Sequence, residues 1–209
     1  MRRAAALGFG TALVAWNNGV LPALRLSSRH RAIAGTVVAA AATAAGSACG
    51  LRRDELGLGN LRAGLRWGSA AAALPVVGYA VALAVPSLHD RFVVPDDVRD
   101  DFGEWVSAHI PFGTVATEEL LFRGLLTAVT ERAFPPAGAT AIRAVTFGLW
   151  HVHPAHRRGR PVPGTVAFTA AAFPRVRLAA RTRSGSLLAP ALLQPGVNAA
   201  ARCCCAASR

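Results

Sequence analysis

The chain has 209 residues, of which 53% are hydrophobic, and a mean hydropathy of +0.36. This length suits a single domain or one compact bundle of membrane helices, and the long apolar blocks favour membrane insertion over an ordinary soluble domain. All 23 basic residues are arginine, and the formal net charge is +12. Because these arginines fall mostly between the apolar blocks, where they would flank membrane segments, we expect no nucleic-acid partner.

Three apolar blocks dominate the first hundred residues. The first two, residues 4–24 and 32–50, are each long enough for a membrane helix, since about 20 apolar residues cross a bilayer. The first block also fits a signal peptide, but no small-residue cleavage site leads into a polar mature region, so we favour a helix. A third block, residues 64–86, contains Pro75 as a kink. It follows a polar loop expected over residues 52–66 and precedes an acidic segment.

The next expected helix, from Thr114 to about Pro135, carries two adjacent acids in an otherwise apolar pattern. A lone carboxylate buried in protein or lipid costs several kcal/mol, so both acids need partners. Arg123 lies one turn after Glu119 on the same face and can pair with it. That pairing leaves Glu118, about 100° around the helix, to point elsewhere. The alternative interpretation is that the two acids and the arginine form a purely structural ion-pair knot.

Further along, a helix over residues 139–153 is expected to end at Pro154 and to carry Phe147 and His151, one turn apart. A single histidine in such a helix is more often structural than catalytic, but this one shares the chain with an acid that lacks an obvious partner. Another span is expected over residues 164–180, although Pro174, Arg175 and Arg177 interrupt it.

The last expected helix covers residues 185–201 and places Gln194 and Asn198 one turn apart, with Pro195 as a kink between them. Three successive helices thus each carry polar groups in apolar surroundings. Polar side chains at membrane depth usually mark a functional site, so the sequence predicts that these groups converge on one interior point.

A carboxylate and an imidazole are the minimum needed to hold a hydrolytic water, either directly or through a divalent metal such as zinc. Glu118 would act as the general base that takes the proton of the water as it attacks an amide carbonyl. Asn198, together with Arg123, would stabilise the oxyanion that then develops.

These residues resemble the signatures of a known family. Glu118-Glu119-x-x-x-Arg123, then Phe147-x-x-x-His151, then a third motif that ends in Asn198, are similar to the three motifs of the CPBP family. That family contains CAAX prenyl proteases and bacteriocin-processing intramembrane proteases. The flanking sequences FRG and GSLLAPALL are similar to those of actinobacterial members, and the resemblance covers about residues 108–200.

The resemblance implies an integral membrane protein of a bacterial cell membrane, folded as an all-α, polytopic bundle of about six to eight helices. It implies one membrane domain over residues 1–209, with hydrophobic helices and loops in residues 1–107 and a catalytic core in residues 108–202. The implied partners are membrane lipid and a peptide or protein substrate.

The roles of the family's motif residues carry over position by position. The catalytic set would be Glu118, Glu119, Arg123, His151 and Asn198, and a divalent metal, zinc in the first instance, would be held by Glu118, His151 and Asn198. Gln194 stands where the family has histidine. Glutamine is a poor zinc ligand, so Gln194 is a doubtful member of the metal site.

The function implied is that of an intramembrane, metal-dependent endopeptidase resembling CAAX prenyl proteases, in which a glutamate-activated water attacks a peptide bond near the membrane. The glutamine in the third motif supports an alternative, a catalytically impaired membrane homologue with an immunity, binding or scaffold role. Restoring histidine at that position would discriminate between the two.

Overall fold

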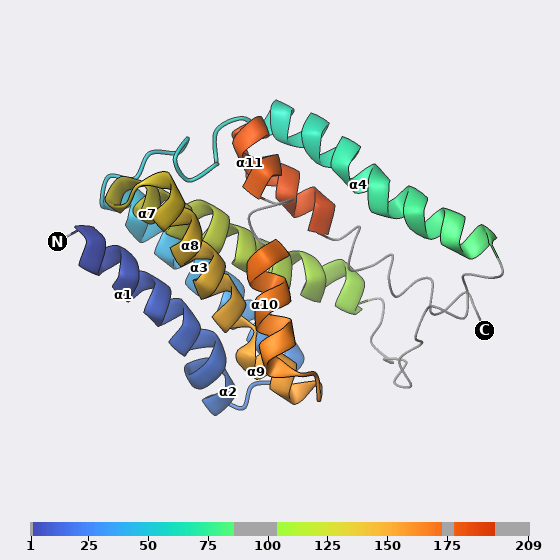
Figure 1. Cartoon of the computed structure of the whole chain (residues 1–209), viewed down its shortest axis with the longest axis horizontal. Helices are drawn as coiled ribbons and strands as arrows, with labels where there is room; N and C mark the ends of the chain where they lie inside the picture. Colours follow the sequence, from blue (N-terminus) through green and yellow to red (C-terminus); the bar gives the residue numbers. More distant parts are fainter. Residues whose placement is uncertain (1, 86–103, 173–177, 195–209) are drawn as a thin grey trace.

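A computed structural model describes residues 2–85, 104–172 and 178–194 of the chain (Figure 1). Within these ranges the regular elements are helices, and the only β-type pairing is an isolated bridge between Leu58 and Ser186. The predicted all-α class is therefore confirmed.

The amino-terminal part of the chain forms two antiparallel rods. The first is continuous and consists of α1 (Arg2–Ala15), η1 (Trp16–Val20) and α2 (Leu21–Ala23). The second is α3 (Ser28–Ala48), which starts where the Ser27 side chain accepts a hydrogen bond from the backbone N–H of His30. Both rods, as predicted for the first two apolar blocks, are long and apolar enough to cross a membrane by length and composition.

The third apolar block forms α4 (Leu61–Ala84), a helix that contains Pro75 and runs along one side of the molecule (Figure 1). The predicted polar loop is correct only as far as Asn60, whose side chain caps the helix by accepting from the N–H of Ala63. This cap starts the helix early and places Arg62 on it instead of in the loop.

The helix that carries the two acids is longer than predicted. It is continuous from residue 104 to residue 133 and comprises η2 (Trp105–Ala116), η3 (Glu119–Leu126) and α7 (Thr127–Ala133). The predicted start at Thr114 is wrong, because Pro111 and Gly113 do not interrupt the helix.

Pro111 and Gly113 both lie within the π-helical segment η2, and two threonines of the same continuous helix reach backbone carbonyls through their side chains. Thr117 and Thr127 each donate a side-chain hydrogen bond to a carbonyl five residues earlier, those of Phe112 (3.2 Å) and Phe122 (2.8 Å). A register of five residues re-routes the backbone bonds that a proline in an α-helix would break.

The next helices break at His151. α8 (Pro136–Trp150) ends and α9 (Val152–Arg157) begins on either side of this residue, whose φ and ψ are −92° and 4°. The prediction that Pro154 ends the helix is wrong, because Pro154 lies in the first turn of α9. A backbone N–H is not needed at that position.

The predicted span over residues 164–180 is not a single described helix. α10 (Val162–Ala172) and α11 (Leu178–Ser184) cover its two ends, and Pro174, Arg175 and Arg177 lie outside the described residues. The last helix begins later than predicted, since residues 188–194 are helical after a turn at Gly185, which has a φ of +65°. Pro195 and Asn198 also lie outside the described residues.

One hydrophobic core joins the two halves of the chain. Leu13 of α1 and Ala39 of α3 belong to the same buried cluster as Phe122 of η3. The Phe122 ring lies edge-on to Phe147 at 5.0 Å and to Trp150 at 5.1 Å between ring centroids. Such edge-to-face pairs add to the stability that area burial gives. The amino-terminal rods therefore pack directly against the helices that carry the candidate site.

Candidate functional site

The first and third motifs meet inside the protein. The side-chain amide of Gln194 donates a hydrogen bond of 3.0 Å to Oε2 of Glu118, and both side chains are buried. An ionised carboxylate only accepts hydrogen bonds, so the NH2 group of the glutamine must face it. The predicted convergence of these two helices is confirmed at this pair of residues.

The second acid has a different partner. Oε1 of Glu119 lies 2.7 Å from Nη1 of Arg123, one turn along the same helix, and the arginine is fully buried. This is the predicted pairing, and it separates the roles of the two adjacent acids. Glu119 neutralises a buried guanidinium, whereas Glu118 is held by an amide that carries no charge.

A chain of contacts links this ion pair to the second motif. The guanidinium carbon of Arg123 lies 5.1 Å from the centroid of the Phe147 ring, and that ring lies edge-on to the His151 ring at 4.7 Å. Nδ1 of His151 lies 2.7 Å from the carbonyl oxygen of Phe147. A carbonyl oxygen only accepts, so Nδ1 carries the proton and Nε2 presents a lone pair.

His151 borders a surface cavity of about 400 Å³ between α9 and α10. Arg158 and Arg160 contribute basic groups to its wall, and Phe168 contributes an apolar one. A histidine at the edge of such a cavity can meet a ligand without any opening of the core.

Residues 104–200 match a family model described as Rce1-like, Type II CAAX prenyl endopeptidase Rce1-like. This segment is similar to the Rce1-like family, the kind of family that the three motifs indicate. Its members are membrane-embedded CAAX-type proteases, which confirms the family predicted from the motifs. Comparisons with curated proteins and with solved structures found no significant match. The division of the chain at residue 107 and the bacterial origin both stay predictions.

The described part of the Rce1-like segment does not form a ready metal site. Among the described residues, no group of three or more histidine, cysteine or acidic side chains lies close enough together to hold a metal ion. A cation bound at Oε2 of Glu118 would compete with the hydrogen bond from Gln194. The expected zinc therefore remains a prediction.

Two asparagines that the sequence analysis did not single out as site residues lie beside the second motif. Asn17 and Asn18 of η1 donate side-chain hydrogen bonds to the carbonyl oxygens of Trp150 (2.7 Å) and Leu149 (2.8 Å). The signal in the sequence was their position inside an apolar block, where an amide needs a partner from another helix.

An ion pair between a buried arginine and a half-exposed glutamate was also missed. Arg143 of α8, which is 3% exposed, lies 2.7 Å from Glu131 and donates to the side chain of Thr140 at 3.1 Å. The hydrophobic periodicity of the sequence places these residues on helices, but it does not indicate which of them pair between helices. They stabilise the contact between α7 and α8 and take no part in the candidate site.

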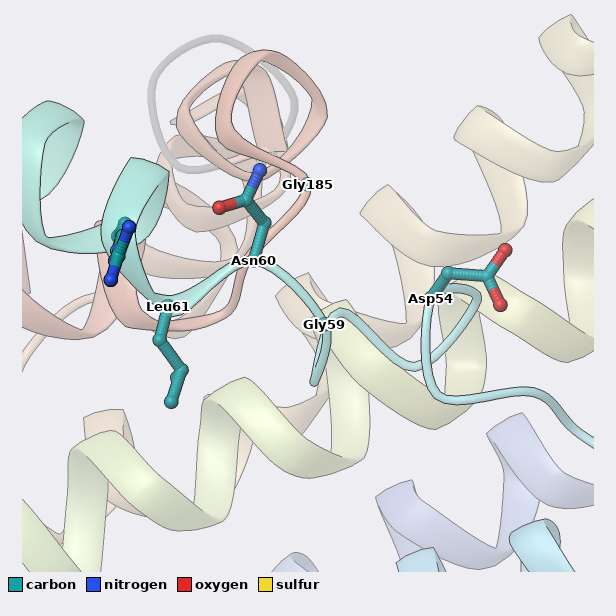
Figure 2. A pocket seen from close by; sticks show the side chains of 6 residues that line it. Asp54, Gly59, Asn60, Leu61 and Gly185 are labelled. Carbon is teal, nitrogen blue, oxygen red and sulfur yellow. The ribbon is translucent and has the colours of Figure 1, made fainter.

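A second surface hollow lies away from the motifs. It measures about 620 Å³ and is lined by the loop before α4 and by the turn before the last helical segment, at residues Asp54, Gly59, Asn60, Leu61, Arg62 and Gly185. Figure 2 shows the carboxylate of Asp54 pointing away from Asn60 and Leu61. That carboxylate forms an ion pair with Arg52 at 2.7 Å.

Proposed function

We propose that this protein is a membrane-embedded endopeptidase of the CAAX prenyl type, in which Glu118 activates a water that attacks a peptide carbonyl near the membrane surface. The observation that carries the proposal is the buried hydrogen bond between Glu118 and Gln194. It brings two of the three motifs together inside the Rce1-like segment.

The glutamine supplies a second acceptor beside the acid. Its Oε1 is buried and has no hydrogen-bond partner among the described residues. A buried unsatisfied acceptor costs free energy unless a water or another donor reaches it. A water between Gln194 and Glu118 would donate one hydrogen to Oε1 and the other to the carboxylate. Its lone pairs would then face the substrate carbonyl.

The reaction needs only proton transfers at Glu118. The carboxylate takes a proton as the water oxygen bonds to the carbonyl carbon, and it returns that proton to the leaving amine as the carbon–nitrogen bond breaks. His151 enters as a second proton acceptor, since Nδ1 is committed to the Phe147 carbonyl and Nε2 is left basic. The amide of Asn198 is proposed as the oxyanion donor.

The proposed substrate is a peptide or protein at the membrane, and the proposed solvent for the helices is lipid. Large apolar side chains on the outer helices support this, because Leu74 of α4 is 76% exposed and Phe168 of α10 is 73% exposed. In water such side chains would form exposed apolar patches, whereas in a bilayer they would be solvated.

The test is cleavage of membrane-embedded and prenylated peptides by the purified full chain. We expect Glu118→Ala and His151→Ala each to lower kcat by about 100-fold or more. Glu104→Ala is the matched control, because this acid is exposed and lies in the same helix, far along the sequence from the motif. Unchanged cleavage in both motif variants would exclude the mechanism. Metal analysis of the same preparations tests the expected zinc.

A second candidate function is a homologue that binds substrates or partners without cleaving them. The same hydrogen bond supports it, since Gln194 occupies part of the catalytic acid and is a poor metal ligand. Gln194→His separates the two functions. A homologue that lacks only this histidine would gain proteolysis from the change, whereas in an active enzyme the change would disturb the proposed water site and reduce cleavage.

A further inference from the structure

The helix break at His151 separates the Leu149 carbonyl from the His153 N–H, which a continuous α-helix would pair. In such a helix the Trp150 carbonyl would face Pro154, which has no N–H to donate. The carbonyls of Leu149 and Trp150 lie at the end of α8, and the N–H of His153 lies in the first turn of α9. Groups of this kind need partners from outside the helix when they are removed from bulk water.

Two neighbouring asparagines of the first rod supply those partners. Asn17 donates to the Trp150 carbonyl at 2.7 Å and Asn18 donates to the Leu149 carbonyl at 2.8 Å. The side-chain oxygen of Asn18 accepts the N–H of His153 at 2.8 Å. Contacts therefore reach the break on both sides of His151, at positions 149, 150 and 153.

The asparagines lie in apolar surroundings, where an amide needs hydrogen-bond partners, and Asn18 also donates to the Val14 carbonyl of its own rod at 3.0 Å. They lie in a rod that is apolar enough to cross a membrane, and both are partly buried. An amide in such a helix is costly unless another segment binds it. They also lie outside residues 104–200, so the contact is made by a part of the chain that the family match does not cover.

We propose that Asn17 and Asn18 are positioning residues that fix the helix break and thereby direct the His151 ring. The bond from Nδ1 to the Phe147 carbonyl depends on where the backbone turns out of α8, and the two amides hold that turn. The expected effect on kcat rests on the proposed function. The expected effect on the His151 tautomer, that is, on which ring nitrogen carries the proton, does not.

The decisive measurement is the tautomer of His151, observed by nitrogen NMR of the detergent-solubilised full chain with labelled histidine. A His151→Ala spectrum assigns the signal. We expect the wild type to show a protonated Nδ1, and we expect Asn17→Ala and Asn18→Ala to show a mixture of the two tautomers. In parallel, kcat should fall by about 10-fold to 100-fold with little change in KM, the effect typical of losing a partner that orients a catalytic group.

Asn60→Ala is the matched control. This residue also caps a helix through its side chain, with a 3.1 Å bond from Ala63, but it lies at the start of α4. It should lower stability by a similar amount and leave the His151 tautomer unchanged. If Asn18→Ala folds poorly, Asn18→Asp takes its place. It keeps the acceptor for the N–H of His153 and removes the donor to the Leu149 carbonyl, so its effect on the tautomer should be intermediate.

The outcomes separate this inference from the proposed function. A tautomer change in the asparagine variants of a protein that never cleaves would support the positioning role while refuting the protease. A wild-type tautomer in Asn17→Ala and Asn18→Ala, with only lower thermal stability, would overturn the positioning role whether or not the protein cleaves peptides.

Discussion

At the residue scale, the ion pair between Arg123 and Glu119 should be sensitive to the loss of one partner. Arg123 is fully buried against Glu119, so Arg123→Ala would leave a buried carboxylate without its charge partner. We expect a loss of about 3–5 kcal/mol in the free energy of unfolding. Chemical denaturation of the purified protein in detergent measures it.

The control for this prediction removes both charges. A Glu119→Leu, Arg123→Met double variant replaces the pair with apolar side chains, and it should be more stable than Arg123→Ala because neither charge is stranded. If the double variant were as unstable as the single one, the ion pair would not be the source of the loss.

At the scale of elements, the close approach of α3 to η2 depends on a small residue. A Cβ atom added at Gly113 would lie 2.6 Å from the Cβ of Ala32 and 3.0 Å from its Cα, so a backbone would have to move. We expect Gly113→Ala to cost about 1–3 kcal/mol of stability, as overpacking does. Gly78→Ala in α4 is the control, since no atom lies within 4 Å of its added Cβ. That change should be neutral, or stabilising by up to about 1 kcal/mol.

At the scale of the whole molecule, the loop around Glu55 joins two helices that are far apart in the sequence, α7 and α11. Its carboxylate binds Arg132 of α7 at 2.6 and 2.8 Å and the N–H of Arg52 at 2.7 Å, and its carbonyl accepts from Arg181 of α11. The hydrogen bond from Arg132, followed by that from Arg52, lowers the pKa of Glu55 below its ordinary value of 4.5.

Because of this lowered pKa, the contribution of Glu55 to the free energy of unfolding depends on pH. The folded state binds the proton of Glu55 less readily than the unfolded chain, so the contribution is full above pH 4.5 and is lost as the pH falls through the folded pKa. Thermal melts of wild type and Glu55→Gln between pH 7 and pH 3 test this. The two melting temperatures should converge at the acid end, and a constant difference would contradict the prediction.

The sequence predicted the pairings that depend on spacing within one helix. The bond from Arg123 to Glu119 follows from their separation of four residues, which places them on the same helix face. This pairing implied that the partner of Glu118 comes from another helix. The sequence placed Gln194 on a helix expected to converge on the same interior point, but it did not identify Gln194 as the hydrogen-bond partner of Glu118. The wide π register at Pro111 was not predictable, because single-helix rules place a boundary there and contacts with α3 override it.

The break at His151 could not be read from local sequence either. Pro154 is the stronger local signal for a helix end, but a proline in a first turn loses nothing. The hydrogen bonds that stabilise the break come from Asn17 and Asn18, more than 130 positions earlier in the chain. Long-range contacts of this kind leave no periodic trace in a sequence, and in the apolar block the two amides looked only like an interruption.

The core shared between the amino-terminal rods and the Rce1-like segment has a practical consequence for expression. A truncated protein that starts at residue 104 would lack Leu13, Ala39 and both asparagines, and its Phe122 face would be left uncovered. We expect such a fragment to elute in the void volume on size exclusion, whereas the full chain in the same detergent should give a single symmetrical peak. Co-expression with a separate chain of residues 1–85 should restore that peak if the two halves recognise each other through this core.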